Sequence, residues 1–210
     1  MLKKYAVLER VHQEKIVGIV RVENEEAAEN TMAALCEGGI GVAELTFTVR
    51  YAHTILEGLT KKYGDKMLLG AGTVLDEATA RIAILSGAQF LVTPSLNTDV
   101  IRLANRYGIP CFSGVSTPTE LQTALEYGVD VVKLFPASCF KPSVIKDWKG
   151  PFPNAEIMPT GGVSLGNISE WLSVGAFACG VGGELVAGAK TGDYASVTAK
   201  AREFRALVKR

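Results

Sequence analysis

Lys133 stands in the apolar segment Val-Asp-Val-Val-Lys-Leu-Phe-Pro, residues 129–136, which has the composition of a buried β-strand. Burying an ammonium group costs several kcal/mol unless it is paired or neutral, so such a lysine tends to lose its proton. A neutral amine attacks ketones and forms a Schiff base, which then accepts electrons from the substrate. The structural alternatives are a lysine that reaches solvent at the strand end or one half of a buried ion pair. This segment alone does not decide between them.

Glu44 is the carboxylate that best fits beside this amine. Side chains alternate across a strand, so Glu44 shares one face of its segment with Thr46 and Thr48, and Lys133 shares one face with Phe135. The apolar residues of the opposite faces, Leu45, Phe47, Val132 and Leu134, are expected under helices. Glu44 and Lys133 then point toward a common interior. There they form either an ion pair that is only structural or an acid/base carboxylate next to an amine nucleophile.

Glycine-rich turns form a second constellation, Thr160-Gly161-Gly162 and Gly180-Val181-Gly182-Gly183. Glycines let backbone N–H groups approach an anion closely, and loops after the last two strands of a parallel barrel commonly hold phosphate. Purely steric reasons for such turns remain the alternative.

The elements that position these residues repeat one pattern, a short apolar strand followed by a helix. Eight strands are expected, at residues 15–22, 41–48, 67–72, 90–94, 110–115, 129–136, 156–162 and 178–183. Helices lie between them, and Asn24, Asp76 and Thr117 with Pro118 carry the signals of helix starts. This pattern predicts a single (β/α)8 TIM barrel domain of the α/β class over residues 1–210, with an open doubly wound sheet as the alternative.

The composition limits the classes of binding partner that we expect for this chain. Acidic and basic residues balance at 22 each, and no basic block stands out, so no nucleic acid partner is expected. We find no signal-peptide core and no apolar run that could span a bilayer, so we expect no membrane partner and a cytoplasmic protein. His12 and His53 have no metal-like spacing, and the four cysteines are scattered, so no metal site is expected.

Eight segments together resemble the 2-keto-3-deoxy-6-phosphogluconate (KDPG) and 4-hydroxy-2-oxoglutarate (KHG) aldolases, over about residues 12–190. They are Gly18-Ile-Val-Arg21, Glu44-Leu-Thr-Phe-Thr48, Gly70-Ala-Gly-Thr-Val74, Gly87-Ala-Gln-Phe90 with Thr93-Pro94, Thr117-Pro-Thr-Glu120, Val132-Lys-Leu-Phe-Pro136, Pro159-Thr-Gly-Gly162 and Gly180-Val-Gly-Gly183.

This resemblance implies a trimeric class I aldolase of the Entner-Doudoroff pathway that acts on a small-molecule 2-keto acid without a cofactor. It implies that Lys133 forms the imine and that Glu44 acts as acid and base through a water. It places Arg21 and Thr73 in the region that binds the pyruvate carboxylate, Phe135 beside the imine and Pro94 in the pocket wall. It also implies that Thr160, Gly161 and Gly162 line the phosphate end, where Gly182 and Gly183 are expected to add backbone N–H groups.

Two positions depart from the family pattern. Many members carry an arginine two places after the strand-two threonine, where this chain has Thr48, with Arg50 two residues later. Such a shift moves a strand side chain by about 6–7 Å, so Arg50 receives no role and Arg21 is the alternative cation. Some members have serine after the last Gly-Gly, where this chain has Glu184. A carboxylate there would repel phosphate unless it points away.

The expected reaction is cleavage of KDPG to pyruvate and glyceraldehyde 3-phosphate, with cleavage of KHG to pyruvate and glyoxylate as a second activity. An unphosphorylated or different 2-keto-4-hydroxy acid is an alternative substrate. A sugar-phosphate epimerase or isomerase, or a non-catalytic protein that binds phosphorylated metabolites, are alternatives of another class. The chain alone does not determine the preferred aldehyde, the C4 stereochemistry or the oligomer interface.

Overall fold

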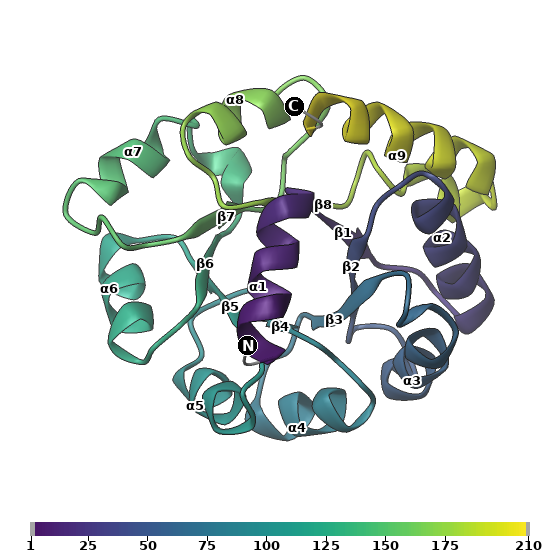
Figure 1. Cartoon of the computed structure of the whole chain (residues 1–210), viewed down its shortest axis with the longest axis horizontal. Helices are drawn as coiled ribbons and strands as arrows, with labels where there is room; N and C mark the ends of the chain where they lie inside the picture. The colour runs from purple at the N-terminus through teal and green to yellow at the C-terminus, as the bar shows by residue number, and fades with distance from the viewer. Residues whose placement is uncertain (1–2, 209–210) are drawn as a thin grey trace.

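Eight parallel strands form a closed (β/α)8 barrel in the computed structural model, which describes residues 3–208 (Figure 1). The strand order is β7-β6-β5-β4-β3-β2-β1-β8, and a bridge between Thr160 and Gly180 joins the two ends of the sheet. The strands are β1 (Ile16–Val20), β2 (Val42–Thr46), β3 (Leu68–Gly72), β4 (Leu91–Val92), β5 (Cys111–Val115), β6 (Val131–Leu134), β7 (Ile157–Pro159) and β8 (Cys179–Val181). The predicted barrel is confirmed, and the open sheet is excluded.

Helices surround this sheet, and three of them begin at the capping residues predicted from the sequence. They are α1 (Lys3–Glu14), α2 (Glu25–Glu37), α3 (Ala52–Tyr63), α4 (Glu77–Leu85), α5 (Thr98–Tyr107), α6 (Pro118–Glu126), α7 (Val144–Lys149), α8 (Ile168–Ser173) and α9 (Tyr194–Val208), with short 3-10 helices at Ala137–Cys139 and Ala187–Thr191. Asn24 caps α2 by accepting the Ala27 N–H at 2.9 Å, and Asp76 caps α4. Thr117 caps α6, whose first residue is Pro118. These side chains satisfy backbone donors that a helix start leaves without partners.

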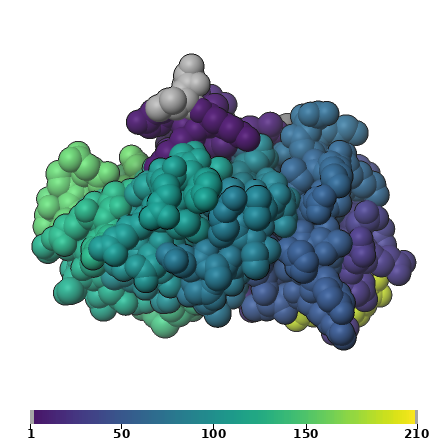
Figure 2. Space-filling model, turned by 90° about the horizontal axis from the view of Figure 1, so that it is seen from below, coloured from purple at the N-terminus to yellow at the C-terminus, as the bar shows by residue number. Residues whose placement is uncertain are grey.

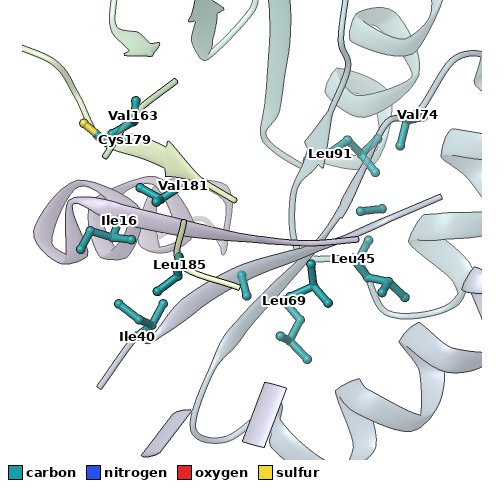
Figure 3. Packing of buried hydrophobic residues seen from close by; sticks show 14 of the residues in the cluster. Ile16, Ile40, Leu45, Leu69, Val74, Leu91, Val163, Cys179, Val181 and Leu185 are labelled. Atoms are coloured by element: carbon teal, nitrogen blue, oxygen red, sulfur yellow. The ribbon is translucent and has the colours of Figure 1, made fainter. Parts of the chain in front are cut away.

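The larger part of the apolar core lies between the barrel and the helices. Outward residues of the strands, such as Ile16, Leu45, Leu69, Leu91 and Val181, are fully buried there (Figure 3). Val132 and Leu134 belong to the same cluster, and Phe47 packs against it half-buried. The alternation predicted for the second and sixth strands is therefore confirmed.

A second, smaller core fills one half of the barrel interior. It comprises inward residues of the strands and their flanks together with two residues of α1, namely Val7, Val11, Val17, Val42, Leu68, Phe90, Val92, Phe112, Val131, Met158, Phe177 and Ala178. The rings of Phe90 and Phe112 stack there with centroids 5.2 Å apart.

Helix α1 closes this end of the barrel. It crosses the barrel axis in Figure 1 and stands out from one face of the molecule in Figure 2. Lys4 pairs with Asp130 before β6 at 2.8 Å, and Arg10 donates to the Lys66 carbonyl before β3 at 2.7 Å. Because these anchors lie at the starts of strands, α1 covers the amino-terminal end, and a site in the interior opens at the carboxyl end.

Several sequence expectations differ in detail from the structure. The expected strands are one to several residues too long, and β4 has only two residues. Of the four cysteines, Cys111 and Cys179 are buried, Cys36 is half-buried and Cys139 is exposed. None of the helices among residues 3–208 has both the length and the apolar character needed to cross a membrane.

Candidate active site

Glu44 and Lys133 lie in the barrel interior, on the carboxyl side of the apolar layer. Each follows an inward residue of that layer by two positions, since Val42 precedes Glu44 and Val131 precedes Lys133. Glu44 is 2% exposed and Lys133 is 5% exposed. The two-residue period of the strands therefore places both side chains in the barrel interior, as predicted from the sequence.

Burial controls the ionisation of both groups. It lowers the pKa of Lys133, which Arg21 lowers further and the charge of Glu44 opposes. It raises the pKa of Glu44, with the charges of Lys133 and Arg21 acting in the opposite direction. Among residues 3–208 Lys133 and Glu44 make no direct ion pair within 4.0 Å. The neutral form of the Lys133 amine and the protonated form of the Glu44 carboxyl are therefore both populated more readily than they are in water.

Phe135 forms one wall beside the amine. The Nζ atom of Lys133 lies 4.9 Å from the centroid of the Phe135 ring. The ring also lies against Gly161, where a Cβ atom would be 3.2 Å from Cε2 of Phe135. Lys133, Phe135 and Gly161 are therefore contiguous.

Pro94 forms a second wall, and its position depends on Gly114. Gly114 of β5 is the strand neighbour of Lys133, and a Cβ atom at Gly114 would lie 2.6 Å from the Ser95 nitrogen. The Thr93 hydroxyl donates to the Ser95 carbonyl at 2.7 Å and accepts the Gly114 N–H at 3.1 Å. The backbone at residues 94–95 thus lies against Gly114, which is next to Lys133 in the strand register. Gly114 was missed from the sequence, although a glycine inside an apolar strand signals such a close approach.

Thr73 follows β3 and has a positive φ of 55°. This left-handed conformation is rare for a β-branched residue and costs about 1–3 kcal/mol, and strain of this kind concentrates at functional sites. Its side chain is half-buried at the end of the strand that adjoins Glu44. The predicted place of Thr73 at the barrel mouth is consistent with this geometry.

Arg21 is the cation whose charge reaches both buried groups. It follows the end of β1 and is exposed, and its charge lowers the pKa of Glu44 and of Lys133. Arg50 lies differently, because β2 ends at Thr46 and the chain then turns. Its guanidinium donates to the Tyr51 hydroxyl at 3.0 Å. Arg50 therefore lies outside β2, and the shift of about 6–7 Å expected for a strand side chain does not describe its position.

Thr160 lies at the closure of the barrel. It is 2% exposed, and its Oγ1 atom is the one buried side-chain polar atom without a hydrogen-bond partner within residues 3–208. Gly180 faces it, since a Cβ atom at Gly180 would overlap the Thr160 hydroxyl. A buried hydroxyl without a partner is unusual and marks a position where a ligand can supply one.

The glycine turns follow β7 and β8 at the carboxyl end of the barrel. Gly161 and Gly162 have φ values of 84° and 86°, and both turns adjoin the strands that the Thr160–Gly180 bridge joins. Within the described chain no protein acceptor takes the N–H groups of Gly162, Gly182 or Gly183. Unpaired amides in such turns form an anion-binding concavity.

The arrangement thus joins a buried amine, a buried carboxyl group and a set of free amides at one barrel mouth. An amine of this kind can form an imine with a keto group, and the carboxyl can move the protons. The free amides suit an anionic group at the far end of a substrate.

Comparisons with known proteins agree with this chemistry. The family model described as "Aldolase: KDPG and KHG aldolase" matches residues 7–200. A 2-dehydro-3-deoxy-phosphogluconate aldolase of Treponema pallidum is 33% identical, over 99% of this chain and 99% of the relative. A 2-dehydro-3-deoxy-6-phosphogalactonate aldolase of Escherichia coli is 33% identical, over 81% of this chain and 83% of the relative.

A solved structure of KDPG aldolase from Legionella pneumophila is similar throughout. It superposes with a TM-score of 0.86 at 27% identity and covers 95% of this chain and 96% of its own. Pyruvate is captured in that protein as a covalent carbinolamine intermediate.

Proposed function

The chain belongs to the KDPG and KHG aldolase family, and we propose that it is a class I aldolase in which Lys133 forms the Schiff base. It cleaves 2-keto-3-deoxy-6-phosphogluconate to pyruvate and glyceraldehyde 3-phosphate. The observation that carries this proposal is the place of Lys133, which is buried beside Glu44 with a lowered pKa. A carbinolamine is the species that an amine forms with pyruvate before the imine, and a relative holds that species.

The first half of the mechanism makes the imine. The neutral Lys133 amine attacks the C2 ketone and forms a carbinolamine. Glu44, protonated more readily than a carboxyl in water, gives a proton to the departing hydroxyl, so water leaves and the iminium remains. The iminium charge is then the electron acceptor in the interior, and it replaces the Lewis acid that a metal would supply.

The second half breaks the C3–C4 bond. The Glu44 carboxylate, directly or through a water, takes the proton of the C4 hydroxyl. The C3–C4 electron pair moves to C3 and neutralises the iminium, which leaves the aldehyde and an enamine of pyruvate. Protonation at C3 and hydrolysis of the imine release pyruvate and restore the Lys133 amine.

The remaining site residues divide between the two ends of the substrate. Arg21 and Thr73 are assigned to the pyruvate carboxylate, which is supported by the charge of Arg21 near both buried groups. Pro94 and Phe135 form the walls around the imine. At the far end Thr160 offers a hydroxyl without a partner, and the backbone amides of Gly161, Gly162, Gly182 and Gly183 hold the phosphate.

A second activity toward 4-hydroxy-2-oxoglutarate is included in the proposal, because the imine chemistry needs only a 2-keto-4-hydroxy acid. The curated relatives include both a phosphogluconate-type and a phosphogalactonate-type aldolase, whose substrates differ in configuration at C4. A panel of both phosphorylated acids, their unphosphorylated analogues and KHG therefore measures the preferred substrate. The expected order places the phosphorylated acids first in kcat/KM.

Reductive trapping tests the mechanism. Borohydride added in the presence of pyruvate should fix one pyruvate-derived group on Lys133, located by mass spectrometry of peptides. Lys15 is the internal control, because its pKa is also lowered by burial, although it lies at the opposite end of the barrel beside α1. A chelator should leave both trapping and turnover unchanged. An adduct on Lys15, or none on any lysine, contradicts the proposed mechanism.

The protein is further proposed to act as a homotrimer in the cytoplasm, with family resemblance as the support. Three exposed apolar side chains, Leu75, Ile82 and Leu85, lie on α4 and the turn before it, where association would cover them. Light scattering should give a mass three times the 22.4 kDa of the chain. A monomer mass at working concentrations contradicts the trimer and leaves the aldolase proposal untouched.

A further inference from the structure

Glu184 follows the Gly182-Gly183 turn directly, yet its carboxylate binds a different loop. The Oε2 atom of Glu184 accepts the backbone N–H of Leu165 at 3.1 Å. Leu165 lies in the loop between β7 and α8, which begins with the Gly161–Gly162 turn. One hydrogen bond of a charged group therefore connects the two turns that are proposed to hold the substrate phosphate.

The β7–α8 loop is otherwise held mainly from within and from the loop after β6. The Ser138 N–H donates to the Gly161 carbonyl at 2.8 Å, and the Asn167 side chain donates to the Gly162 carbonyl at 2.9 Å. The contact between Glu184 and Leu165 is the side-chain hydrogen bond that joins this loop to the β8 turn within residues 3–208. Its loss would let the two sets of amides move relative to each other.

The charge of Glu184 also reaches α9 on the outer surface of the barrel. The pKa of Lys200 on α9 is raised, mainly by its hydrogen bond to Glu203 and in smaller part by the charge of Glu184. Helix α9 packs on the outer surface of the barrel (Figure 1), and the partner of the Glu184 carboxylate, Leu165, lies in the loop that leads to α8. The Glu184 carboxylate is therefore engaged by a backbone amide of that loop.

We propose that Glu184 is a positioning residue for the phosphate-binding turns: it ties the β8 turn to the β7–α8 loop through Leu165 and so determines the affinity for a phosphorylated substrate without touching it. The inference rests on the proposed function and identifies the residue that selects the phosphorylated tail. The carboxylate satisfies a loop amide and holds the other amides in register. The hydrogen bond to Leu165 offsets part of the repulsion between the Glu184 carboxylate and the phosphate.

Two substitutions separate this role from its alternatives. Glu184→Ala removes the acceptor, and loss of one such hydrogen bond should raise KM for KDPG by about tenfold with kcat nearly unchanged. KM for KHG, which has no phosphate, should stay as in the wild type. Glu184→Gln keeps an oxygen that can accept the Leu165 N–H, so it should restore most of the affinity. Glu170→Ala is the matched control, because Glu170 is an exposed acid on α8 whose side chain makes no hydrogen bond or ion pair within residues 3–208.

Inorganic phosphate gives a readout that does not depend on turnover. Its dissociation constant, measured by titration calorimetry, should rise about tenfold in Glu184→Ala and little in Glu184→Gln or Glu170→Ala. If both Glu184 variants bind phosphate and KDPG more tightly than the wild type, Glu184 repels the phosphate and the inference is wrong. Unchanged phosphate affinity in Glu184→Ala also overturns it. If the wild type releases no pyruvate from either substrate, the proposed function fails, and phosphate titration still decides the inference.

Discussion

Gly72 of β3 lies directly against the carboxylate of Glu44 on the neighbouring strand. A Cβ atom at Gly72 would lie 2.6 Å from Cδ of Glu44 and would overlap the Oε1 atom. The two residues belong to adjacent paired strands, and Gly72 pairs with Thr46. The absence of a side chain at Gly72 is therefore what gives the Glu44 carboxylate its place in the interior.

Gly72→Ala should displace the Glu44 carboxylate and reduce kcat by about 10²-fold, because a shift of about 1 Å in a catalytic group has effects of this size. Steady-state pyruvate release measures it. Gly58→Ala is the matched control, since Gly58 lies exposed in α3 with open space around its Cβ position. That variant should keep full activity and gain up to about 1 kcal/mol in the free energy of unfolding. Equal activity of the two variants contradicts the assigned position of Glu44.

Glu44→Gln keeps the size and hydrogen bonding of the side chain and removes the base. Turnover should fall by about 10²–10⁴-fold, the usual contribution of general acid–base catalysis. Binding of pyruvate, measured by trapping at varied pyruvate concentration, should change much less. Near-normal turnover would mean that Glu44 is only a structural partner of Lys133.

Arg21→Gln should move the pH dependence of imine formation to higher pH. Burial is the main cause of the lowered pKa of Lys133, and the Arg21 charge lowers it further, so removing that charge raises the pKa. Because the neutral amine is the nucleophile, the rate of trapping at saturating pyruvate should then rise only at higher pH.

Arg50→Gln serves as the control for this pH shift, because Arg50 lies beside Tyr51 outside β2. Its trapping profile should overlay that of the wild type. A shift in Arg50→Gln with none in Arg21→Gln would identify Arg50 as the cation of the site.

The buried charges should also lower the stability of the fold near neutral pH. The pKa of Glu44 is raised in the folded protein, so its favourable contribution is present below the ordinary carboxyl pKa. This contribution is lost as pH rises through the raised pKa. Glutamine does not titrate, so the stability of Glu44→Gln relative to the wild type should increase from acid to neutral pH. Urea unfolding at several pH values measures this trend.

The double variant Lys133→Met/Glu44→Gln removes both buried charges. It should be more stable than the wild type by about 1–4 kcal/mol at neutral pH, the order of the gain when buried charged groups are replaced by well-packed uncharged side chains of similar volume. A less stable double variant would indicate that the two charges support the fold.

The alternating pattern of the strands was sufficient to predict the inward faces of β2 and β6. Glu44 and Lys133 alternate with Leu45, Val132 and Leu134, which lie under the helices as expected. Helix starts at Asn24, Asp76 and Thr117 were also predicted, because a capping side chain bonds an amide only three residues away. Periodicity and capping depend on residues that are close together in the chain, so they can be predicted from the sequence.

Contacts between distant segments were decided only by the tertiary structure. Strand register sets Gly72 against Glu44 and Gly114 beside Lys133, and α1 closes the barrel opposite the site. The direction of the Glu184 carboxylate follows from a loop 19 residues away. Such relations arise from the closure and stagger of the whole barrel, which no local sequence pattern encodes. The residue types therefore determined which chemistry the chain carries, and barrel closure decided which of those groups meet.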